Sequence, residues 1–234
     1  MADIFLIRHG QASFGKENYD ALSDLGKQQA VVLGRSLAST IKPTQLICGT
    51  LNRQQQTLEG LVTGYEQVTG SSLELPVQIK PEFNELDHTN ILTVHDERFA
   101  DPEYMKREIL TQPEANKVFH KIYTQAIFNW FEGKDGDYTE SFDEFYQRVT
   151  GAVNNIISNA QSKERIVVVS SAGSISMCLQ DVLGVSAKKA FELNEVMANT
   201  AVNRFVFNGS GKLNLSYYNN FHHLPMADVK VTYR

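Results

Sequence analysis

Two stretches of the chain combine residue types that bind anions. Arg8, His9 and Gly10 directly follow an apolar run, residues 4–7, that has the composition of a buried strand. Burying an arginine and a histidine is costly unless a partner compensates them. A second arginine, Arg53, lies near the start of a predicted helix. Either the strand simply ends in water, or its end is a place where a negatively charged group is bound.

Phosphoryl transfer is the chemistry that these residues favour. Arginines bind oxyanions through bidentate hydrogen bonds, and a helix N-terminus also favours negative charge. A phosphoryl group in transfer spreads its charge over three equatorial oxygens, and such a cluster stabilises that arrangement. The neutral imidazole of His9 could attack phosphorus and form a phosphohistidine. The flanking cations Arg8 and Arg53 favour the neutral form of His9.

The elements that position these residues alternate between strand and helix patterns, which predicts an α/β fold with a mainly parallel sheet covered on both faces. In such sheets, ligands bind outside the carboxyl ends of the strands. This rule places the RHGQ, GTLNR and SSAGS loops at one edge. Strands are expected at 4–7, 45–48, 77–79, about 165–169 and on both sides of the NGSG turn at 208–211, and helices at about 24–40, 52–65, 142–161 and 177–183.

The bulk composition fits one domain that carries an insertion. The chain has 234 residues, of which 42% are hydrophobic and 21% charged, as in ordinary globular proteins. Residues 1–234 are therefore expected to form a single domain. The segment at about 85–135 has a helical pattern with proline breaks, and we expect it to form a helical cap over the site edge.

Charge and cysteine content limit the partners and the compartment. The net charge of −5 gives no basic field for nucleic acid or an anionic membrane. No segment approaches about 18 consecutive apolar residues, and a cytoplasmic location is expected. Cys48 and Cys178 lie in apolar stretches, which indicates buried reduced thiols rather than a disulfide or a zinc site.

The motifs resemble the histidine phosphatase superfamily, the group related to the phosphoglycerate mutases. FLIRHGQ, the Leu-Ser-Asp-Leu-Gly segment that follows it and the later Arg-Gln-Gln-Gln-Thr carry the resemblance. It extends from residue 4 to the terminal NNFHHLP and implies a three-layer α/β/α fold without a metal or other cofactor. It also implies a phosphohistidine on His9 and phosphate binding by Arg8 and Arg53. We add Gln11, in the same turn, to the expected phosphate ligands.

Glu85 is the expected general acid. In many members of the family, an acidic residue in the capping insertion protonates the leaving oxygen, and Glu85 in FNELDH is the matching carboxylate. A carboxylic acid must hold its proton at the working pH to serve in this way. The alternative is a solvated carboxylate at the start of a helix.

The fourth strand leads into a departure from the family pattern. The family usually has Ser-His-Gly-Gly there, and its second histidine binds the phosphoryl group. In this chain Ser171 and Ala172 stand at the positions of that histidine and of the first glycine. A hydroxyl can donate one hydrogen bond but carries no charge. Ser171, Ser174 and the backbone N–H groups of the turn could still bind an anion, although Ser171 could instead be a structural turn residue.

Three other histidines and one glycine bear on this reading. His88 lies three residues after Glu85, so a helix would place both on one face, and we hypothesise that His88 replaces the absent histidine. A capping or pairing role is the alternative. Adjacent side chains on an extended segment point to opposite faces, so His222 and His223 do not predict a metal site. Gly15, where mutases typically have asparagine, favours a phosphatase over a mutase.

The sequence therefore predicts a metal-independent phosphatase acting on a phosphomonoester, either a small molecule or a phosphoprotein. The alternative is a non-catalytic module that binds a phosphate ligand or a protein, and a phosphoglycerate mutase is less favoured. No nucleic-acid or membrane partner is expected. An edge strand near the C-terminus could pair with a second chain in a homodimer.

Overall fold

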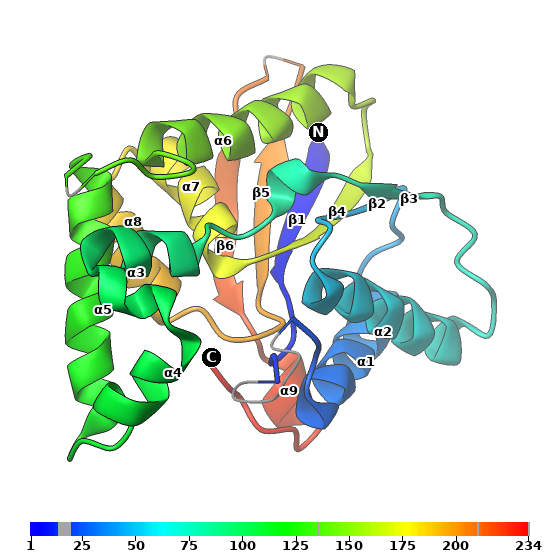
Figure 1. Ribbon diagram of the computed structural model, residues 1–234. Coiled ribbons are helices and arrows are strands. Elements are labelled where there is room, and N and C mark those ends of the chain that lie inside the picture. Colours follow the sequence, from blue (N-terminus) through cyan, green and yellow to red (C-terminus); the bar gives the residue numbers. More distant parts are fainter. Residues whose placement is uncertain (14–19, 135, 210, 234) are drawn as a thin grey trace. The chain divides into compact units, whose positions relative to one another are not determined.

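The computed structural model describes residues 1–13, 20–134, 136–209 and 211–233. Within this part of the chain, six strands form one sheet in the order β3-β2-β4-β1-β5-β6 (Figure 1). The strands are β1 (Ala2–Arg8), β2 (Gln45–Cys48), β3 (Val77–Ile79), β4 (Arg165–Ser170), β5 (Val202–Phe207) and β6 (Asn214–Asn220). The pairs β1–β4, β4–β2 and β2–β3 are parallel, whereas β5 is antiparallel to β1 and β6. The predicted α/β fold with a mainly parallel sheet is confirmed.

The helices follow the predicted order with two differences. They are α1 (Asp24–Ala38), α2 (Asn52–Thr69), α3 (His88–His95), α4 (Pro102–Tyr104), α5 (Ala115–Phe131), α6 (Phe142–Asn159), α7 (Ala172–Leu183), α8 (Ala187–Glu195) and α9 (His223–Met226). Helix α7 begins at Ala172 rather than at residue 177, because its small polar first turn is buried instead of forming a loop. Helices α8 and α9 were not predicted.

The core explains why β1 reads as a continuous apolar run. Phe5 and Ile7 point to one face of the sheet, where they pack with Leu33 of α1 and Leu61 of α2. Helix α7 packs along β1 and β6, and Figure 1 shows it on the side of the sheet opposite α1 and α2. A strand buried on both faces needs apolar side chains at every position. The three layers therefore fix β1 up to its carboxyl end at Arg8.

Two compact units divide the chain, one made of residues 1–85 and 149–234 and the other of residues 86–148. In the second unit, the buried Trp130 ring packs against Phe142 and Phe145, and its Nε1 donates to the carbonyl oxygen of Glu140 at 2.9 Å. This unit extends past the predicted insertion end at about 135 because the first turns of α6 pack on that indole. Its predicted role as a cap stays a prediction.

Helices α1 and α2 cross with their backbones close together. A Cβ added at Gly34 would lie 2.0 Å from the carbonyl oxygen of Leu61, and one added at Gly64 would lie 2.0 Å from that of Val31. Side chains at these positions would force the helices apart. The glycines therefore set the distance between the helix that follows the RHGQ turn and the helix that carries Arg53.

No helix in the described ranges is long and apolar enough to cross a membrane.

Candidate functional site

The RHGQ turn at the end of β1 is held from three sides. The N–H of His9 donates to the carbonyl oxygen of Ser170 on β4 at 2.9 Å. The N–H of Gly10 donates to Thr57 Oγ1 on α2 at 2.9 Å. A Cβ at Gly10 would lie only 2.5 Å from the carbonyl oxygen of Gly26 on α1. The turn therefore lies against α1, α2 and β4 at once, and position 10 has no room for a side chain.

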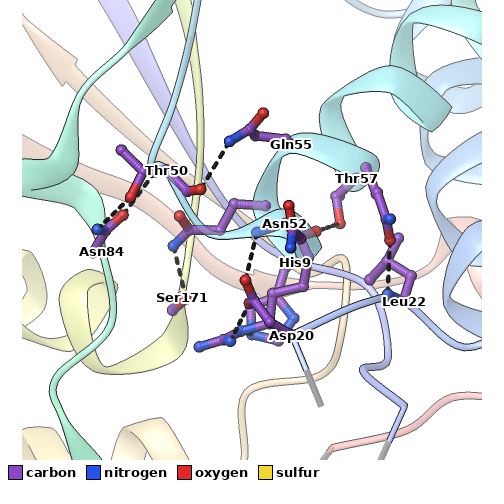
Figure 2. A network of polar contacts seen from close by, with 12 residues as sticks. His9, Asp20, Leu22, Thr50, Asn52, Gln55, Thr57, Asn84 and Ser171 are labelled. Carbon is purple, nitrogen blue, oxygen red and sulfur yellow. Dashed lines mark hydrogen bonds and ion pairs between the residues drawn. The ribbon is translucent and has the colours of Figure 1, made fainter. Parts of the chain in front are cut away.

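The hydrogen bonds of the His9 ring assign its tautomer. Nδ1 lies 2.7 Å from the carbonyl oxygen of Gly10. Because a carbonyl can only accept, Nδ1 carries the proton and Nε2 keeps its lone pair. The Nε–H of Arg53 donates to that Nε2 at 3.3 Å. The residue is 7% exposed, and Figure 2 labels it close to Asp20 and Asn52. The nitrogen that could attack phosphorus is thus Nε2, and it lies next to a guanidinium.

A carboxylate that the sequence reasoning missed, Asp20, binds Arg53 from the other side. Asp20 Oδ1 lies 2.6 Å from Arg53 Nη1, and Oδ2 accepts from the N–H of Asn52 at 2.8 Å. Figure 2 shows the second of these bonds at the first turn of α2. Helix α2 begins after Leu51, which cannot cap it with a side chain. That missing cap was the available signal that a distant carboxylate is needed there.

Arg8 is held differently from Arg53. Its Nη1 donates to the carbonyl oxygen of Tyr233 at 2.8 Å and also to that of Met197. These bonds direct the guanidinium to main-chain oxygens of the C-terminal part of the chain. The structure thus brings Arg53 to His9, while contact between Arg8 and a phosphoryl group stays a prediction.

Glu85 lies at the N-terminus of α7. Its Oε2 accepts from the N–H of Gly173 at 3.2 Å. The segment before it is fixed by two hydroxyls: Ser170 Oγ donates to the carbonyl oxygen of Phe83, and Ser174 Oγ to that of Asn84, each at 2.7 Å. Glu85 is therefore held next to the turn that follows β4, the edge where the sequence placed the site.

The predicted helical relation between Glu85 and His88 is wrong. Glu85 lies in an irregular segment, and His88 is the first residue of α3, which Asp87 caps. Within the second unit, His88 Nδ1 lies 2.6 Å from Tyr123 Oη. A capped helix start rather than a continuous helix explains the error, because Asp87 ends the irregular segment. Gly15, the other residue weighed for the substrate class, lies outside the described residues.

Three predicted phosphate ligands have internal hydrogen bonds. Ser171 is the N-cap residue of α7, is 0% exposed, and its Oγ accepts from Gln54 Nε2 at 2.9 Å. Ser174 is buried and bonded to Asn84, as above. Gln11 Oε1 accepts from Ser23 Oγ at 2.9 Å. These bonds give Ser171, Ser174 and Gln11 clear structural roles, and phosphate binding by them stays a prediction.

A buried polar network supports the backbone of His9. Asn199 Nδ2 donates to the His9 carbonyl oxygen at 3.1 Å, and the N–H of Thr200 lies 3.1 Å and 3.3 Å from the carbonyl oxygens of Arg8 and His9. Thr200 has φ of +59°, which is rare for a β-branched residue. Its Oγ1 donates to the carbonyl oxygen of Asn199 at 2.7 Å, so it accepts from His223 Nε2 at 2.9 Å.

His223 is a buried neutral base in this network. Burial lowers the pKa of its imidazole to about 4, with a smaller contribution from His222. The predicted extended conformation of His222 and His223 is wrong, because His222 has helical dihedrals and His223 begins α9. The two adjacent histidines carry no sequence signal for this role, because Thr200, the hydrogen-bond partner of His223, is distant in the chain.

Neither cysteine is set up as an alternative nucleophile. Burial raises the pKa of the Cys48 thiol to about 11 and that of Cys178 to about 12, so both remain protonated near neutral pH. In the part of the chain that the structure covers, no three histidine, cysteine, aspartate or glutamate side chains are grouped to hold a metal ion.

The titration of His223 predicts how stability depends on pH. Because its pKa is about 4 in the folded chain and about 6.5 in the unfolded one, the unfolded chain binds a proton first as the pH falls. The stability that comes from keeping His223 neutral is therefore fully present above about pH 6.5. As the pH falls toward 4, the free energy of unfolding decreases by about 3 kcal/mol. Urea denaturation of wild type and of His223→Gln across this range measures it. A difference between them that does not change with pH contradicts the assignment.

A family model described as histidine phosphatase superfamily (branch 1) matches residues 4–92 and 86–220. No curated protein sequence matches the chain significantly. The matched ranges include the RHGQ turn, the Arg53 helix, Glu85 and Ser171.

Several solved structures share the fold at low sequence identity. A phosphoglycerate mutase from Bacillus anthracis str. Sterne has a TM-score of 0.65 and 14% identity, covering 97% of this chain and 96% of its own. A phosphoserine phosphatase from Entamoeba histolytica has a TM-score of 0.65 and 18% identity, covering 96% and 100%. An alpha-ribazole phosphatase from Shigella flexneri has a TM-score of 0.61 and 22% identity, covering 94% and 96%.

Proposed function

The chain belongs to the histidine phosphatase superfamily, and on that premise we propose that it hydrolyses a phosphomonoester through a phosphohistidine on His9. One observation carries the proposal: the His9 ring donates Nδ1–H to the carbonyl oxygen of Gly10 and presents Nε2 next to Arg53. An imidazole held in this tautomer is a nucleophile with a fixed direction of attack.

The reaction has two displacement steps. In the first, His9 Nε2 gives up its hydrogen bond from Arg53 and forms a bond to phosphorus while the ester P–O bond breaks, and the leaving oxygen takes the proton of Glu85. In the second, water attacks the phosphohistidine, Glu85 takes a proton from that water, and the P–N bond breaks to release inorganic phosphate. The ionised and protonated forms of Glu85 alternate between the steps, so protons balance over the cycle.

The arginines stabilise the charge on the transferred group. Arg53 lies beside Nε2, so its remaining N–H groups can bind the equatorial oxygens of a phosphoryl group on that nitrogen. We assign the second guanidinium to Arg8, at the end of the same strand. Asp20 shares Arg53 with the incoming group and keeps its guanidinium oriented. No step requires a metal ion, which a chelator tests directly.

The substrate class follows from the chemistry rather than from the neighbours. Structures less than 25% identical show the fold alone, and the three above have different names: a mutase, a phosphoserine phosphatase and an alpha-ribazole phosphatase. We therefore propose a phosphatase for a small-molecule or phosphoprotein phosphomonoester, with Gly15 weighing against a mutase.

A second candidate function is a non-catalytic module that binds a phosphate ligand or a protein. The observation that favours it is Ser171, which provides no second imidazole and is bonded to Gln54 without any exposed surface. Such a site would keep the anion affinity of Arg53 and lose turnover.

A generic aryl phosphate separates the two candidates. Wild type should release phosphate equally with and without chelator, and His9→Ala should lower kcat at least about a thousandfold because it removes the nucleophile. His120→Ala, a histidine of the second unit, is the matched control and should retain activity. Binding of phosphate or vanadate by wild type without any turnover supports the non-catalytic module instead.

The proton donor can be tested by the leaving group. Glu85→Gln should lower kcat/KM, which reports the first displacement, by about 10²-fold for an alkyl phosphate, whose leaving oxygen needs a proton. It should lower kcat/KM much less for a p-nitrophenyl phosphate, whose leaving group departs as an anion. An equal loss with both substrates would show that Glu85 acts otherwise.

A further inference from the structure

Gln54 has an unusual position for a glutamine in the first turn of a surface helix. It has no exposed surface and follows Arg53 directly. Its Nε2 donates at 2.9 Å both to the carbonyl oxygen of Phe83 and to Ser171 Oγ. Figure 2 shows the bond to Ser171 as a dashed line. Both amide protons of one side chain are therefore used within the site.

These two bonds connect the groups that the mechanism needs. Phe83 lies two residues before Glu85, so the first bond fixes the segment that carries the proton donor. Ser171 is the N-cap residue of α7, and the N–H of Gly173 in that first turn binds the Glu85 carboxylate. Gln54 itself is on the helical turn whose Arg53 binds His9 Nε2. The Gln54 amide thus connects the segment that carries the proton donor to the helical turn that contacts the nucleophile.

The carbonyl end of the same amide indicates why a glutamine is present. Among the described residues, Gln54 Oε1 is buried without a hydrogen-bond partner. A Cβ added at Gly49 would lie 2.0 Å from this oxygen, so the amide is packed against the main chain after β2. A buried acceptor without a donor is destabilising, and an aliphatic side chain would avoid that. The amide is therefore explained by what its two N–H groups hold.

We propose that Gln54 is a positioning residue that sets the distance between Glu85 and His9 and fills the volume next to position 171. This inference rests on the proposed function. Ser171 has no exposed surface and contacts the Gln54 amide, so a larger side chain at 171 needs the space that the amide occupies. Gln54 and Ser171 form a matched pair in which a long side chain on α2 faces a short one at the N-cap of α7.

A conservative variant tests the positioning role. Gln54→Met keeps most of the volume and removes both donors, so kcat/KM, which reports the first displacement, should fall by about 10–100-fold. The loss should be greater for an alkyl phosphate than for an aryl phosphate, because it acts through Glu85. A merely structural effect lowers both equally. Gln55→Met is the matched control, because its amide bonds to the carbonyl oxygen of Thr50 at an exposed position.

Exchanging the long and the short side chain between positions 54 and 171 tests the volume argument. Ser171→His and Gln54→Ala should each lower kcat, the first by crowding and the second by leaving a hole. The double variant should lose less activity than the two single losses combined, because the imidazole takes the space of the amide, and it should stay below wild type because the amide donors are gone. Thermal unfolding of each variant controls for folding. Additive losses in the double variant, or full activity of Gln54→Met, would overturn the inference.

The two proposals fail in different ways. If wild type has no turnover that depends on His9, the proposed function fails. Thermal unfolding of Gln54→Ala, Ser171→His then still tests the pairing: a fall in Tm smaller than the sum of the two single falls supports it, and an additive fall refutes it.

Discussion

The hydrogen bond from His9 Nδ1–H to the carbonyl oxygen of Gly10 is the constraint on which the site depends. It fixes the tautomer, and so decides which nitrogen can react. The bond forms because the turn cannot relax: Gly10 lies against Gly26, and Thr57 holds its N–H. Behind the turn, the buried network around Thr200 holds the carbonyl oxygen of His9 itself. These contacts fix the backbone and therefore the direction of the His9 side chain.

The charges around this imidazole are arranged in pairs rather than as an open cluster of cations. Arg53 lies between His9 and Asp20, so the guanidinium is oriented before any ligand binds. Glu85 is bound at the N-terminus of α7 by Gly173. Preorganised dipoles and charges stabilise a developing phosphoryl charge without reorganising at the moment of reaction. The same preorganisation gives the site a defined geometry with a serine, Ser171, at the turn after β4.

The sequence was sufficient for whatever depends on local pattern. Apolar runs predicted the strands, and the carboxyl-end rule predicted that Arg53 would meet His9. It could not predict contacts between distant polar residues: Asp20 caps a helix that starts far along the chain, and Gln54 reaches Ser171 across the sheet edge. Small polar residues also hid the start of α7, since their burial is a tertiary effect. Hydrogen bonds between polar residues distant in the chain depend on the fold, and the hydrophobic periodicity of the sequence does not predict them.

Trapping the covalent intermediate tests the central claim most directly. The protein is mixed with a phosphomonoester, quenched rapidly in alkali, digested, and the peptides are weighed by mass spectrometry. The account predicts one added phosphoryl group on the imidazole of His9 during turnover, acid-labile and absent from His9→Ala. Turnover that proceeds with the phosphoryl group on another residue, or with none attached to the protein, would contradict it.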